Sequence, residues 1–119
     1  MSNIKLETLK TIDGYVSSAL IDLESGMVMA GDGDGSIDLD LAAAGNCEVL
    51  KRKMRVADSL TLNDSVDDIL ITLTKQYHLL RPLATNNKVF LYLVLNRDKS
   101  NLAMARHVLK AFEKELDFS

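Results

Sequence analysis

The side chains best placed to bind a metal ion lie in one short acidic stretch. Four oxygen-bearing residues stand there at alternate positions: Asp32, Asp34, Ser36 and Asp38. This spacing resembles the start of a calcium-binding EF-hand loop, which also requires glycine at its sixth position and a bidentate glutamate at its twelfth. The chain has Ile37 and Ala43 at those positions. We therefore interpret the stretch as a solvated loop whose aspartates cap the helix that follows.

Glycines in the same stretch invite comparison with loops that cradle phosphate groups. Gly31, Gly33 and Gly35 alternate with the aspartates. No Gly-Lys-Ser or Gly-Lys-Thr follows them, and the interleaved carboxylates would repel a phosphate. The sequence therefore does not predict that this chain binds a nucleotide.

One cysteine and two histidines complete the candidates for metal or nucleophilic chemistry. Neither His78 nor His107 has a second histidine or a cysteine at zinc-ligand spacing. Nothing in the sequence brings Cys47 to a histidine, as a cysteine nucleophile requires. We predict no catalytic residue, no metal and no cofactor, and we expect that the chain is not an enzyme.

A basic cluster follows in the predicted second helix: Lys51, Arg52, Lys53 and Arg55. On a helix these residues spread over much of the circumference, and their place in the C-terminal half suits the helix dipole. We interpret them as a solvated charge run, with a docking surface for an acidic partner as the alternative.

Composition places the chain among ordinary globular proteins. It has 119 residues, 47% of them hydrophobic and 26% charged, so we expect one domain over 1–119. The net charge of −3 argues against a nucleic-acid partner. The single cysteine, the charged N-terminus and the lack of a membrane-length apolar run predict a cytoplasmic protein without membrane insertion.

Apolar periodicity and turn residues predict an α+β fold. The expected elements are a short helix over 2–12, strands over 15–23, 27–30, 69–74, 77–83 and 88–95, and helices over 38–57 and 101–116, with a flexible loop over 31–36. The strand over 88–95 is apolar on both faces, which predicts a central strand covered on both sides. A five-stranded antiparallel sheet with helices on both faces, in the order α-β-β-α-β-β-β-α, satisfies these patterns.

The helix over 38–57 carries two apolar stripes. The stronger one predicts the core face: Leu39, Ala43, Cys47, Leu50, Met54 and Ala57. The weaker one lies about a quarter-turn away: Ala42, Gly45, Val49 and Val56. Because one packed face needs only one stripe, the second, built of small residues, indicates that another helix lies against it.

Two stretches resemble the roadblock / dynein light chain family. In 14–30 an apolar strand, the turn Glu24-Ser25-Gly26 and a second apolar strand follow one another. The second stretch, 89–106, contains an apolar strand, then a polar loop over 96–101, then a helix that begins at Leu102. The resemblance covers nearly the whole chain and implies a profilin-like sheet of order two-one-five-four-three.

This resemblance also implies a homodimer. Family members pair their third strand, an edge strand, with its twin and place their second helices side by side. The dimer interface would then include Ala42, Gly45, Val49, Val56, Ile69, Ile71 and Leu73. The second stripe independently requires a partner, and an exposed apolar edge strand is normally covered.

The function implied is that of a non-catalytic homodimeric adaptor or regulator. It would bind a Ras-like small GTPase or a related P-loop protein and modulate its nucleotide cycle or its location, as bacterial roadblock proteins do. Partner-binding candidates on the second helix are Glu48, Lys51, Arg52 and Arg55. One alternative is a structural scaffold subunit of a larger complex with no GTPase partner. Another, a small-molecule sensor or enzyme on the same sheet, lacks an acid–base pair.

Overall fold

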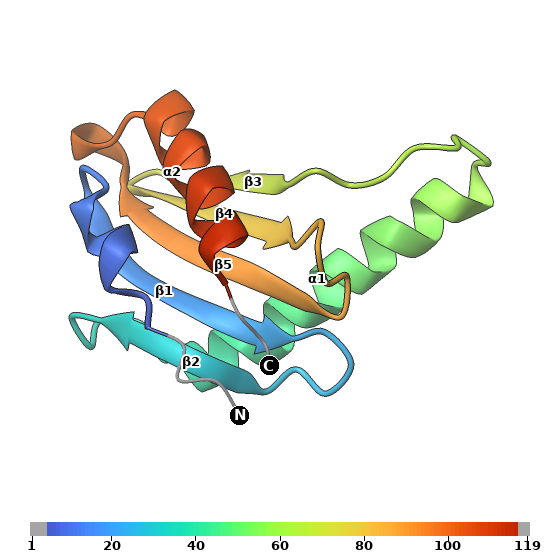
Figure 1. Cartoon of the computed structure of the whole chain (residues 1–119), viewed down its shortest axis with the longest axis horizontal. Helices are drawn as coiled ribbons and strands as arrows, with labels where there is room; N and C mark the ends of the chain where they lie inside the picture. The colour runs from blue at the N-terminus through green and yellow to red at the C-terminus, as the bar shows by residue number, and fades with distance from the viewer. Residues whose placement is uncertain (1–4, 117–119) are drawn as a thin grey trace.

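A five-stranded antiparallel sheet carries one long helix on each face (Figure 1). The structure is a computed structural model that describes residues 5–116. Its elements are η1 (Glu7–Thr11), β1 (Tyr15–Asp22), β2 (Val28–Gly33), α1 (Leu39–Ser59), β3 (Ile69–Thr72), β4 (Gln76–Pro82), β5 (Val89–Asn96), η2 (Arg97–Lys99) and α2 (Leu102–Glu115). The strand order is β2-β1-β5-β4-β3. The predicted fold class, element order and sheet order are therefore confirmed.

Strand β5 is central, as its two apolar faces predict. It pairs with β1 on one side and β4 on the other, and its residues from Val89 to Leu95 are buried. Alternate side chains enter two separate cores. The α2-face core includes Leu9, Leu20, Leu79, Leu91, Leu93, Leu109 and Phe112. The α1-face core includes Ala19, Ile21, Ala43, Cys47, Leu50, Phe90 and Tyr92.

The first helix differs from the prediction. Instead of an α-helix over 2–12, residues Glu7–Thr11 form a 3₁₀-helix, and residues 2–4 lie outside the described part of the chain. Leu6, Leu9 and Ile12 are buried in the α2-face core. Their i, i+3 spacing fits a 3₁₀-helix as well as an α-helix, because residues three apart are eclipsed in the tighter helix.

Strand β2 extends into the stretch that we predicted as a flexible loop. Gly31 pairs with Ala19 and Gly33 with Ser17. A Cβ at Gly31 would lie 3.0 Å from Leu39 Cδ1, and one at Gly33 would overlap the Ser17 side chain. Gly31 therefore allows α1 to lie close to the sheet, and Gly33 allows a close approach to β1. In the sequence, glycines with this role resemble loop residues.

Both long helices begin with a side-chain cap, and for α1 this is one of the predicted aspartates. Asp38 Oδ1 accepts a hydrogen bond from the N–H of Leu41 at 3.2 Å, and Asn101 Oδ1 accepts one from Met104 at 3.1 Å. These side chains satisfy backbone donors that the first helical turn leaves unpaired. The C-terminal part of α1 projects beyond the sheet (Figure 1). Within residues 5–116 no helix combines the length and apolar character needed to cross a membrane.

Strand β3 is an edge strand, as expected, but it is shorter than predicted. It ends at Thr72, and Leu73 instead donates its N–H to the Gln76 carbonyl at 2.8 Å, which closes a tight turn into β4. Strand β4 ends at Pro82, where a residue without an N–H does least harm to a sheet ladder.

Candidate functional site

Helix α1 has an inner face, two flanks and an outer surface, and the packing of the inner face fixes the direction of the other three. Ala43, Cys47 and Leu50 are buried against the sheet. On one flank, Cys47 Sγ donates to the Leu23 carbonyl at 2.9 Å and Lys51 Nζ to the Glu24 carbonyl at 3.1 Å. This flank therefore faces the β1–β2 hairpin.

The opposite flank carries the second apolar stripe. Because successive helical residues are about 100° apart, Ala42, Val49 and Val56 lie on the side of α1 away from the β1–β2 hairpin, toward the half of the sheet that ends in β3. Val49 is 43% exposed and Val56 48% exposed. A Cβ at Gly45 would meet nothing within 4 Å. We call Ala42, Val49 and Val56 the apolar flank.

Strand β3 lies at the sheet edge on the side of the apolar flank. Among residues 5–116 it pairs only with β4, in the register Ile69↔Leu80 and Ile71↔His78. The side chains of Ile69 and Ile71 are half-buried against the α1-face core. They do not project from the edge, so the edge offers backbone hydrogen-bonding groups. Leu73, which we predicted within the strand, is exposed just beyond its end.

A polar cluster that sequence reasoning missed lies beneath α1 in this half of the sheet. The Tyr92 hydroxyl is 3.0 Å from His78 Nδ1, and His78 Nε2 is 2.9 Å from Gln76 Oε1. Burial lowers the pKa of His78, which keeps its ring neutral at pH 7. Burial also raises the pKa of Tyr92, an effect that a side-chain hydrogen bond with Asn46 partly offsets. The strand alternation places His78 and Tyr92 on this face but does not reveal their contact.

Three of the four predicted partner-binding residues share the outer surface of α1. Glu48, Arg52 and Arg55 are exposed at i, i+4 and i+7 positions. Lys51 does not join them, because its ammonium group is held at the hairpin carbonyl of Glu24. The ion pairs found among residues 5–116 are Lys10–Asp32, Arg81–Glu113 and Arg106–Asp68. The charges of Glu48, Arg52 and Arg55 therefore point to solvent.

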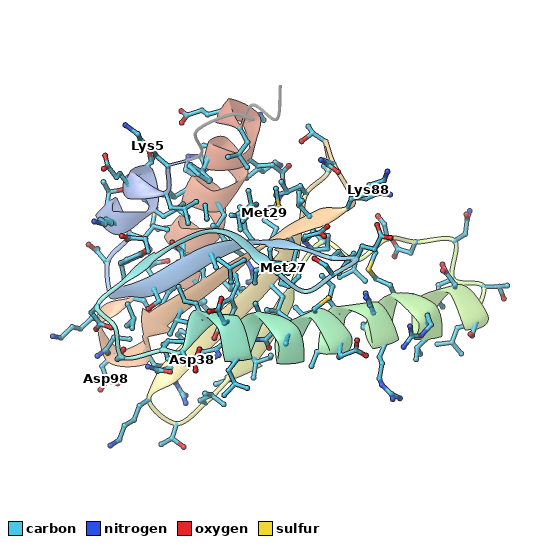
Figure 2. The ribbon with its side chains drawn as sticks, turned by 90° about the horizontal axis from the view of Figure 1, so that it is seen from below. Lys5, Met27, Met29, Asp38, Lys88 and Asp98 are labelled. Carbon is cyan, nitrogen blue, oxygen red and sulfur yellow. The ribbon has the colours of Figure 1, made fainter. Side chains whose placement is uncertain are left out.

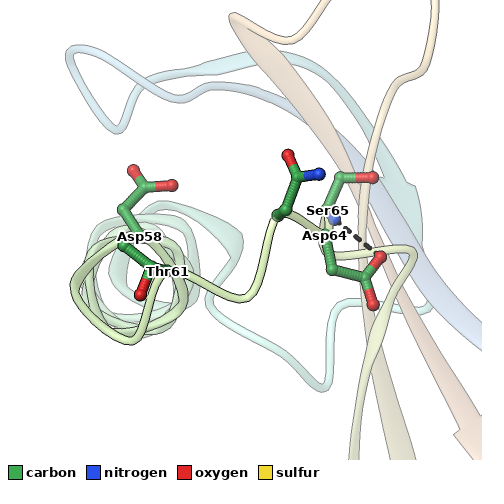
Figure 3. A pocket seen from close by; sticks show the side chains of 5 residues that line it. Asp58, Thr61, Asp64 and Ser65 are labelled. Atoms are coloured by element: carbon green, nitrogen blue, oxygen red, sulfur yellow. Dashed lines mark hydrogen bonds between the residues drawn. The ribbon is translucent and has the colours of Figure 1, made fainter.

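A hollow at the end of α1 offers no catalytic chemistry. It has a volume of about 570 Å³ and is lined by Asp58, Thr61, Asn63, Asp64 and Ser65 (Figure 3). It is open to solvent, and its lining holds no histidine, cysteine or lysine to form an acid–base or nucleophile–base pair. Burial raises the pKa of the Cys47 thiol, which disfavours the reactive thiolate. Within the described residues, no three His, Cys, Asp or Glu side chains gather as metal ligands would.

The comparisons with known proteins bear on the fold. No protein-family model and no curated protein matches the sequence. Among solved structures, a roadblock/LC7 domain from Streptomyces avermitilis is similar with a TM-score of 0.79 and 13% identity, over 92% of this chain and 88% of that one. Myxococcus xanthus MglB has a TM-score of 0.69 and 13% identity, over 96% and 100%.

The gliding protein MglB from Thermus thermophilus has a TM-score of 0.68 and 18% identity, over 92% of this chain and 85% of that one. Identities this low carry information on architecture rather than on activity. The match extends over nearly the whole chain in all three structures. Together with the observed strand order and the helix on each face, it shows that this chain has the roadblock fold.

Proposed function

We propose that the chain forms a homodimer through the apolar flank of α1 and the open edge of β3. The observation that carries this proposal is the position of these two features on one side of the molecule. Val49 and Val56 are nearly half exposed at the middle and end of a long helix, and no described residue pairs with the outer edge of β3. A two-fold axis between two copies would pair both features with themselves.

Small residues on the apolar flank and beside it support a helix–helix contact. Ala42, Gly45 and Val49 lie within two helical turns, and Gly45 leaves open space where a side chain would stand. Two such helices can approach closely, because little side-chain volume separates their backbones. Ile69, Ile71 and Leu73 would then lie next to the strand pairing rather than form its contacts, since the first two are directed into the core.

The second part of the proposal concerns the partner. We propose that the dimer is an adaptor or regulator that binds a Ras-like small GTPase or a related P-loop protein and modulates its nucleotide cycle or location. Supporting this, the fold is that of roadblock proteins, and the similar structures include MglB of two bacteria, one of them described as a gliding protein. Glu48, Arg52 and Arg55 offer solvent-facing charges on the paired helices.

The proposed role is non-catalytic. Any acceleration of GTP hydrolysis would come from ordering the GTPase's own catalytic residues. If this chain also supplied a positive charge to the transition state, Arg52 and Arg55 would be the residues to test. Lys51 is a poorer candidate than the sequence indicates, because breaking its hydrogen bond to Glu24 would accompany binding.

A pull-down from purified components tests the partner. The chain would be immobilised and presented with a panel of Ras-like GTPases, each loaded with GDP or with a non-hydrolysable GTP analogue. We expect retention that depends on the nucleotide, and its loss when Arg52→Glu and Arg55→Glu are combined. Lys110→Glu, an exposed charge reversal on α2, should leave retention unchanged. Retention that is absent for every GTPase, or equal in both nucleotide states, would refute this partner class.

The structural scaffold subunit is the second candidate, and the two open edges of the sheet favour it. Both β2 and β3 end the sheet among the described residues, so strands of other proteins could be added there. A stable partner that co-purifies from cells and lacks a nucleotide-binding motif would support this role over GTPase regulation.

A further inference from the structure

Strand β2 forms the second edge of the sheet, opposite the proposed dimer interface. Among residues 5–116 it pairs only with β1. Asp34 donates its N–H to the Val16 carbonyl at 3.3 Å across this pair. Because N–H groups alternate in direction along an antiparallel strand, those of Gly31 and Gly33 point outward, and neither residue has a side chain to shield the edge.

Two exposed methionines lie beside this edge. Figure 2 looks onto the β2 edge and shows Met27 and Met29 near the middle of the view. Met27 is 69% exposed and Met29 39% exposed. Charged side chains, proline and β-bulges usually protect such an edge. Strand β2 contains Asp32 and a register shift opposite Leu20 and Ile21, but no lysine and no proline. An edge that combines free backbone groups with apolar side chains is suited to receiving another strand.

The segment of the chain that contains β2 carries acidic residues and no basic ones. Residues 22–40 contain six of the 17 acidic residues of the chain and no lysine or arginine. Hydrogen bonds from Tyr15 to Asp32 and from Ser36 to Asp34 lower the pKa of both carboxyl groups, so they are ionised at neutral pH. Of the six, only Asp32 has an ion-pair partner among the described residues, Lys10 at 3.4 Å.

We infer that the β2 edge binds an extended basic segment of another protein, which adds to the sheet as a sixth strand. Its backbone would hydrogen-bond with the outward groups of Gly31 and Gly33. Apolar side chains on the segment would contact Met27 and Met29, and its lysines or arginines would lie near Asp34 and the neighbouring acidic residues. A second copy of this chain is a poor occupant, because pairing β2 with β2 would bring two acidic segments together.

This site is independent of the proposed dimer and of any GTPase. Dimerisation through β3 would leave one β2 edge free at each end of the extended sheet, on the side opposite the shared interface. Loss of the dimer would therefore not remove the site, and failure of the site would not affect the dimer.

The test uses the full chain and a short blocked peptide that alternates lysine and valine, labelled for fluorescence anisotropy. A peptide that alternates glutamate and valine is the control ligand. We expect the basic peptide to bind, to bind more weakly as salt is raised, and to protect the amides of Gly31 and Gly33 from hydrogen exchange. The acidic peptide should not bind.

Variants locate the site. Met29→Lys removes an apolar contact and places a positive charge next to the positively charged peptide. It should weaken binding by about fivefold. Met104→Lys makes the same change at an exposed methionine of α2 and should have no effect. No binding of the basic peptide, equal binding of both peptides, equal affinity of Met29→Lys and wild type, or amide protection away from β2 would each overturn the inference.

Discussion

A buried ion pair anchors α2 to the sheet and allows a quantitative prediction. Arg81 lies on β4, and its Nε is 3.3 Å from Oε1 of Glu113 on α2. The two side chains are only 8% and 6% exposed. They are surrounded by the α2-face core, which contains Leu79, Leu83 and Phe112. Neither charge can regain much solvation if its partner is removed while α2 stays in place.

Glu113→Leu should therefore be among the most destabilising substitutions that leave the apolar core intact. Removing one member of a buried pair costs about 3–5 kcal/mol, because the remaining charge is left desolvated. Combining Arg81→Met with Glu113→Leu removes both charges and should recover most or all of that loss. Lys10→Gln, in the ion pair with Asp32 whose side chains are 53% and 27% exposed, should cost about 1 kcal/mol or less.

Urea unfolding followed by circular dichroism measures these differences. All variants must be compared at one protein concentration, since an oligomer gains apparent stability with concentration. We expect the order of stability to be wild type, Lys10→Gln, then Glu113→Leu, with the double variant near wild type. A Glu113→Leu variant no less stable than Lys10→Gln, or a double variant no more stable than Glu113→Leu alone, would show that the pair is not effectively desolvated.

Three further predictions concern backbone strain, pH and thiol reactivity. Gly14→Ala should destabilise the protein by about 1–3 kcal/mol in thermal unfolding, because Gly14 has φ of 81° and a Cβ would lie 2.9 Å from the Asn96 carbonyl oxygen; an unchanged Tm would contradict this. Burial lowers the pKa of His78 in the folded protein, so below about pH 6.5 the unfolded state binds more protons and the free energy of unfolding decreases as the pH falls. His78→Gln should reduce this loss of stability below about pH 6.5. An unaltered pH dependence of stability in the variant would refute the contribution of His78. Iodoacetamide should modify Cys47 far more slowly in the native protein than in urea, because the thiol is buried and its pKa is raised. Equal rates would show that the thiol is not shielded between α1 and the sheet.

Patterns of local residues predicted much of the fold. The two apolar faces of 88–95 indicated a central strand, and the aspartates of the acidic stretch indicated the cap of α1. The same kind of reasoning was wrong for glycine, which occurs both in flexible loops and in strands where another part of the chain approaches closely. Gly31 and Gly33 stand in a strand because Leu39 and Ser17 approach them closely, a tertiary contact that the local sequence does not contain.

The contacts within the candidate site were less accessible to sequence reasoning. The second stripe of α1 was visible in the sequence. The hydrogen bond from Lys51 to the Glu24 carbonyl was not, because it joins residues 27 apart. Arg81 and Glu113 are 32 apart, and His78 and Tyr92 are 14 apart. Alternation assigns each of these strand residues to a face of the sheet, but the choice among partners on that face depends on strand register and helix position.

The oligomeric state in solution tests the proposed interface most directly. Light scattering would compare wild type with Val49→Glu, which places a charge on the apolar flank at a half-exposed position outside the buried core. Ala111→Glu, at an exposed site on α2 across the sheet, is the matched control. The proposal predicts a dimeric wild type, a dimeric Ala111→Glu variant and a folded, monomeric Val49→Glu variant. A monomeric wild type, or a Val49→Glu variant as dimeric as wild type, would contradict it.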